Sequence, residues 1–138
     1  MADTKTPTPA EIAVMAGGAL ALIGSFLHYR YASSLWSKGF LPSGTLMALF
    51  ATAMAVVVAL RFLNVSLPAR VVGLSWIQVH LVLGFFAALY AIAFLITAGG
   101  GRKVGTWLVT IGCIAAFVGA IMMSRDSSST SAGPGPAA

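Results

Sequence analysis

The stretch VVGLSWIQVHLVLGFFAALYAIAFLITAGGG, residues 71–101, contains no lysine, arginine, aspartate or glutamate. A helix of about 20 apolar residues crosses the roughly 30 Å hydrocarbon core of a bilayer, so this stretch is longer than one span needs. Either the helix is strongly tilted, or residues 68–74 lie along the membrane surface and bend near Gly73. We favour the bend. It predicts a transmembrane helix over 75–97.

Three more windows lack charged residues, namely 12–29, 39–60 and 104–124, and each is 18 to 22 residues long. Each reaches or approaches the length of one span, and none shows the alternation of a strand. Within lipid, a helix satisfies its own backbone polar groups, whereas an open strand does not. The sequence therefore predicts an all-α fold of four transmembrane helices in an antiparallel bundle. Besides 75–97, the expected helices are 10–27, 43–62 and 104–123.

This pattern divides the chain into three parts. Residues 1–9, with Pro7 and Pro9, are expected to form a flexible N-terminal segment, and residues 10–124 the transmembrane domain. Residues 125–138 are rich in serine, glycine and proline and predict a disordered tail. The first helix is interpreted as retained and not as a signal peptide, because acidic residues offset Lys5 and no convincing cleavage site follows.

The composition excludes several classes of function. The chain has 138 residues, of which 59% are hydrophobic and 8% charged, and its mean hydropathy is +0.95. A soluble fold cannot cover itself with so few charges, so the net charge of +5 indicates a bilayer partner and not nucleic acid. The single cysteine, Cys113, allows no intrachain disulfide, and two histidines with three acidic residues predict no metal site.

Basic residues do not decide the orientation of the bundle. In the predicted topology, four lie on each face of the membrane: Lys5, Arg61, Arg70 and Arg125 on one, and Arg30, Lys38, Arg102 and Lys103 on the other. The loop over 28–42 carries aromatic residues typical of a membrane interface, and it resembles a periplasmic or extracellular connection. We therefore expect both termini on the cytoplasmic face of a bacterial plasma membrane.

Small residues recur along the predicted helices at spacings that favour close helix contacts. Association in lipid depends on such contacts because hydrophobic drive between helices is weak. The predicted contact glycines are Gly17, Gly24, Gly84, Gly105, Gly112 and Gly119. A comparable stripe on the second helix consists of Ala48, Thr52, Ala55 and Ala59. Four such seams favour a monomeric four-helix bundle over a homo-oligomer.

Few residues of the predicted spans carry chemistry. Neutral His80 has the properties to ligate a haem, relay protons or bind a quinone, but a histidine near a helix end more often bonds to a neighbouring helix or a headgroup. His28 cannot pair with it, because the two lie at opposite ends of their spans. A cluster at the start of the third span therefore predicts lipid or partner recognition: Arg70, Trp76, Gln78 and His80.

Residues 64–85, NVSLPARVVGLSWIQVHLVLGF, together with four spans and a Ser/Pro-rich end, resemble a group of small integral membrane proteins of actinobacteria. The resemblance implies a four-helix fold and a bacterial plasma membrane. That group has no agreed activity, so the resemblance assigns no catalytic residue and no cofactor.

Three hypotheses of function follow. The leading one is a non-enzymatic structural or accessory component of a membrane or envelope assembly, with lipids and another membrane protein, or further copies of itself, as partners. The second is a small oligomeric transporter or channel, with Thr52, Tyr90, Thr106 or Thr110 facing a shared pathway. The third is a haem or quinone carrier that uses His80.

Overall fold

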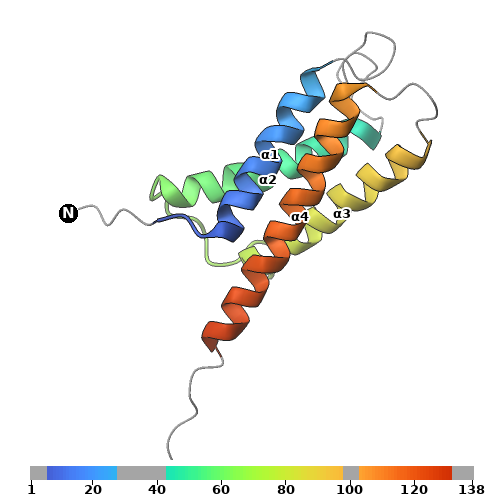
Figure 1. Ribbon diagram of the computed structural model, residues 1–138. Coiled ribbons are helices and arrows are strands. Elements are labelled where there is room, and N and C mark those ends of the chain that lie inside the picture. The colour runs from blue at the N-terminus through green and yellow to red at the C-terminus, as the bar shows by residue number, and fades with distance from the viewer. Residues whose placement is uncertain (1–5, 28–42, 98–102, 132–138) are drawn as a thin grey trace, which may run out of the picture.

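The computed structural model describes residues 6–27, 43–97 and 103–131 and folds them into four helices (Figure 1). Their bounds are α1 Pro9–Phe26, α2 Ser43–Phe62, α3 Trp76–Thr97 and α4 Val104–Ser131. Over these ranges the protein contains helices and no β-strand, only an isolated bridge between Val71 and Leu74. The predicted all-α bundle is confirmed.

Three of the helices are long and apolar enough to cross a membrane: Pro9–Phe26, Trp76–Ile96 and Val104–Ser129. In α2, the corresponding apolar stretch covers Ala48–Phe62 and is shorter. By length and composition, the chain is a membrane protein. Large apolar side chains such as Phe85, Leu89 and Ile96 are exposed on α3, as expected of a helix that faces lipid.

Helices α1 and α4 run antiparallel and lie side by side along the bundle (Figure 1). A Cβ atom placed on Gly112 would lie 2.5 Å from the Gly17 carbonyl oxygen and 2.6 Å from the Ala21 nitrogen. Near the start of α1, a Cβ on Gly119 would lie 2.8 Å from the Ala10 carbonyl oxygen. The two backbones therefore touch, and only glycine leaves room for that approach.

The other predicted contact glycines lie on the same or neighbouring interfaces. A Cβ on Gly24 would lie 2.9 Å from Val109, and one on Gly17 would lie 2.6 Å from Ala116. Gly84 of α3 faces Phe117 of α4, whereas Gly105 is buried in the first turn of α4. The structure thus places Gly17, Gly24 and Gly84 where helices meet.

Helix α2 packs against α1 and α3, and the predicted stripe lies on the side that faces α1. Its buried residues are Ala48, Ala51, Met54 and Val58. Of the predicted set, only Ala48 is buried, while Thr52, Ala55 and Ala59 line a shallow groove of about 240 Å³ against α1. The stripe therefore faces α1, where a Cβ atom on Gly18 would clash with the Ala55 side chain. Met54 packs toward α3 instead, where its Cε atom lies 3.3 Å from the Cβ position of Gly84.

Helix α4 is longer than the sequence predicts. It continues past Met123 to Ser131, so the expected boundary between a bundle ending at 124 and a disordered tail from 125 is wrong over residues 125–131. The hydroxyls of Ser127 and Ser128 donate to the Ser124 carbonyl, at 2.8 and 2.9 Å. The hydroxyl groups of these serines are therefore hydrogen-bonded within their own helix. In addition, no glycine or proline interrupts the segment before Gly133.

Several predictions fall outside the described residues. They concern the flexible segment at residues 1–5, the aromatic loop over 28–42 with His28, the glycine turn over 98–102 and the tail from 132. These remain predictions.

Candidate functional site

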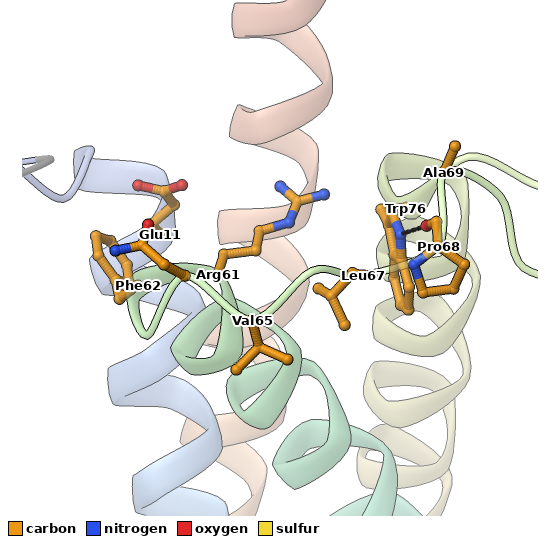
Figure 2. Close-up of a pocket in the computed structure, with 9 residues that line it drawn as sticks. Glu11, Arg61, Phe62, Val65, Leu67, Pro68, Ala69 and Trp76 are labelled. Atoms are coloured by element: carbon orange, nitrogen blue, oxygen red, sulfur yellow. Dashed lines mark hydrogen bonds between the residues drawn. The ribbon is translucent and has the colours of Figure 1, made fainter.

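A cavity of about 450 Å³ opens at one end of the bundle, where α1 begins, α2 ends and α3 begins (Figure 2). The connection from α2 to α3, residues 63–75, forms one of its walls. Its lining mixes charged, polar and apolar residues: Glu11, Arg61, Phe62, Asn64, Val65, Leu67, Pro68, Ala69 and Trp76. The volume lies within the range typical of small-molecule sites.

Glu11 reaches the cavity from the first turn of α1. Thr8 caps this helix, because its hydroxyl accepts from the Glu11 backbone nitrogen at 3.3 Å. In return, the Glu11 carboxylate accepts from the Thr8 backbone nitrogen at 3.0 Å, which completes a capping box. This reciprocal pair fixes the carboxylate at the rim, where its negative charge also suits the helix N-terminus.

Arg61 lies in the last turn of α2, where its positive charge suits the C-terminal end of the helix. Its guanidinium stands across the cavity from the Glu11 carboxylate, and no ion pair joins these two side chains (Figure 2). This arrangement keeps the two opposite charges of the cavity apart. It leaves most of the five guanidinium donors available to a ligand.

The connection between α2 and α3 is held in place by turns. Asn64 has a φ of 55°, which ends α2 in the left-handed conformation that asparagine tolerates. Further on, Val71 and Leu74 exchange backbone hydrogen bonds of 3.0 and 2.9 Å around a tight turn at Val72 and Gly73. The predicted bend near Gly73 is present, and the φ of 80° at that residue explains the glycine.

Trp76 links this connection to α3 through a hydrogen bond. Its indole nitrogen donates to the Pro68 carbonyl at 2.7 Å, across the wall of the cavity (Figure 2). Gln78 stabilises the start of the same helix, because its side-chain oxygen accepts from the Ser75 nitrogen at 2.9 Å while the Ser75 hydroxyl accepts from the Gln78 nitrogen at 3.4 Å. The wall of the cavity is thus anchored to a capped helix.

His80 lies one helical turn deeper and is buried, with 1% of its surface exposed. Its Nδ1 lies 2.6 Å from the Trp76 carbonyl oxygen, which selects the tautomer that carries the proton on Nδ1. Its Nε2 is buried and has no hydrogen-bond partner among the described residues. His80 does not line the cavity.

The structure brings the four predicted recognition residues to one end of the bundle but does not join them in one site. Trp76 lines the cavity, Arg70 is exposed on the connection, Gln78 caps α3, and His80 is enclosed by helices. Across the described ranges, no group of three or more His, Cys, Asp or Glu side chains is placed to hold a metal ion.

Sequence reasoning missed the two charged residues of the cavity. In the sequence, Glu11 counts only as one of the acidic residues that offset Lys5, and Arg61 only as one of the basic residues weighed for orientation. One signal was present in the sequence: Thr8-Pro9-Ala10-Glu11 has the spacing of a capping box, which places Glu11 in the first turn of a helix.

Comparison of the chain with known protein families, with curated proteins and with solved structures finds no match.

Proposed function

We propose that this chain is a non-enzymatic integral membrane protein that serves as a structural or accessory component of a membrane or cell-envelope assembly. The observation that supports this role is the close packing of its helices. Backbone contacts at Gly17, Gly112 and Gly119 hold α1 against α4, which suits a rigid scaffold better than a protein that must open a pathway.

Two threonines of the helices, Thr52 and Thr110, donate their hydroxyl hydrogen bonds within their own helices. Thr110 donates to the Thr106 carbonyl at 2.8 Å and is buried, and Thr52 donates to the Ala48 carbonyl at 2.7 Å. A solute pathway needs polar groups that face a shared lumen. The groove that Thr52 lines is otherwise formed by apolar side chains and glycine. This pattern supports a packing role for these residues.

We place the contact with a partner at the end of the bundle that carries the cavity. Arg70 is exposed there, and Val72 at the tip of the adjoining turn is 95% exposed. The last turns of α4 project from the same end, with Arg125 exposed (Figure 1). An exposed cation beside an exposed apolar tip is a combination that suits a partner protein at the membrane surface.

We further propose a bacterial plasma membrane as the location, with both termini in the cytoplasm. The start of α1 and the end of α4 lie at the same end of the bundle, because Ala10 packs beside Gly119. Because of that contact, the start of α1 and the end of α4 lie on the same side of the membrane. The assignment of this side to the cytoplasm depends on the aromatic residues of the loop over 28–42. The choice of a bacterial plasma membrane depends on the resemblance to actinobacterial membrane proteins.

Photocrosslinking in native membranes tests the proposed role. With a photoreactive residue at position 70, we expect a discrete crosslinked protein band, whereas the same residue at Leu89, which is 49% exposed on α3, should give none. Membrane abundance of both variants is the control. If position 70 yields no band beyond that of position 89, or if purified protein in liposomes passes solutes and Thr110→Val stops the flux, the proposed function is wrong.

A further inference from the structure

We propose that the cavity between Glu11 and Arg61 binds the zwitterionic headgroup of a phosphatidylethanolamine lipid. In this arrangement the phosphate lies against Arg61, the ammonium group against Glu11, and an acyl chain along α1. The inference goes beyond the proposed function, because such a site does not depend on the presence of a protein partner.

The two charges of the cavity are opposite in sign, as are the phosphate and the ammonium of this headgroup. A guanidinium binds phosphate oxygens in a two-pronged geometry, and this Arg61 lies in the cavity without an ion pair to the acid opposite. One Glu11 oxygen already accepts from the Thr8 nitrogen, but a carboxylate retains further acceptor sites for a primary ammonium. A purely anionic ligand would meet repulsion at Glu11, and a purely cationic one at Arg61.

Apolar grooves continue from this cavity toward the middle of the bundle. The first has a volume of about 280 Å³, shares Phe62 with the cavity and is lined by Ile12, Met15 and Ala16 of α1. The second, of about 240 Å³, shares Met15 with the first and follows α1 along Ala19 and Leu22. From Ile12 to Leu22 the helix rises by about 15 Å, a length that accommodates much of an acyl chain.

The position of the cavity relative to the apolar helices also fits a lipid. It lies where α1 and α3 begin and α2 ends, which is the level of the headgroups if these helices span the bilayer. Trp76 forms part of the wall, and tryptophan favours this level of the membrane. The polar cavity therefore lies where a lipid headgroup would lie, and the apolar grooves lie where its acyl chain would follow.

Native mass spectrometry of the purified chain with lipids of equal acyl chains tests the proposal. We expect phosphatidylethanolamine to bind about tenfold more tightly than phosphatidylglycerol, which lacks the ammonium group, a ratio that corresponds to about 1.4 kcal/mol. Phosphatidylcholine should also bind more weakly, because its trimethylated nitrogen donates no hydrogen bond. Equal affinity for all three lipids would overturn the proposal.

Two variants and one control locate the site. Glu11→Gln should abolish the preference for phosphatidylethanolamine over phosphatidylglycerol while α1 stays capped, since glutamine also serves in a capping box. Arg61→Gln should weaken both lipids about tenfold, a loss of about 1.4 kcal/mol. Lys103 is exposed just before α4, at the end of the bundle opposite the cavity, so Lys103→Gln should change neither the lipid preference nor the affinity. An equal loss in Lys103→Gln would show nonspecific charge attraction and contradict the site.

The groove is tested separately from the headgroup. Ala19→Phe fills the second groove and should weaken phosphatidylethanolamine while leaving the weak binding of free phosphoethanolamine unchanged. If Ala19→Phe leaves lipid affinity unchanged, the acyl chain does not lie along α1, and the lipid assignment fails.

Discussion

Replacing Gly112 by leucine is expected to destabilise the bundle by about 3 kcal/mol, at the upper end of typical overpacking costs. Even a Cβ atom at this position would lie 2.5 Å from the Gly17 carbonyl oxygen and 2.6 Å from the Ala21 nitrogen. Both obstacles are backbone atoms, so no side-chain rotation relieves the clash. Helices α1 and α4 would have to separate. Thermal and denaturant unfolding in detergent measures the loss.

Ala53→Leu is the matched control for this substitution. Ala53 is exposed on α2, so the added methylenes should enter lipid or detergent and leave stability unchanged. Equal unfolding midpoints for Gly112→Leu and the wild type would show that α1 and α4 do not meet through these glycines, and the arrangement of the bundle would then be wrong.

Met54→Ala is expected to cost about 2–4 kcal/mol, within the range for deletion of a buried methionine. Met54 is fully buried on α2, and its Cε atom lies 3.3 Å from the Cβ position of Gly84 on α3. Its removal leaves a void between these helices that their backbones cannot easily close. The substitution destabilises the bundle because van der Waals packing holds helices together even where the hydrophobic drive is weak.

Met122→Ala provides the comparison, because Met122 is 38% exposed near the end of α4. We expect this variant to unfold within about 0.5 kcal/mol of the wild type, as is usual for surface substitutions. A similar loss in both variants would indicate that Met54 has no special place in the core.

The charge-free windows located the helices well. Together with the prolines and charges that flank them, they predicted α2 at its observed bounds of Ser43–Phe62, and the starts of α1 and α3 to within one residue. They could not predict the end of α4, because charged residues mark where lipid ends and not where a helix ends. Arg125 and Asp126 are compatible with further helical turns outside the membrane.

Packing was harder to predict than helix position. Glycine spacing identified the contacts of α1 and α4, because backbone approach needs small residues on both partners. On α2 the small-residue stripe identified the side that faces α1, but it gave no sign that Met54 enters the space that Gly84 of α3 leaves open. The cavity was missed because its charges, Glu11 and Arg61, belong to different helices. Their meeting depends on how α1 and α2 pack, which the sequence does not state.

Cysteine accessibility in intact membranes tests the central claim, a bundle that spans the bilayer and carries its charged cavity at one face. In a Cys113→Ala background, single cysteines at Ser66, Lys103 and Ser129 report the α2–α3 connection, the start of α4 and its end; all three positions are exposed. We predict that an impermeant thiol reagent labels Ser66→Cys and Ser129→Cys from one side and Lys103→Cys only from the other. Labelling of all three from the same side would contradict the account.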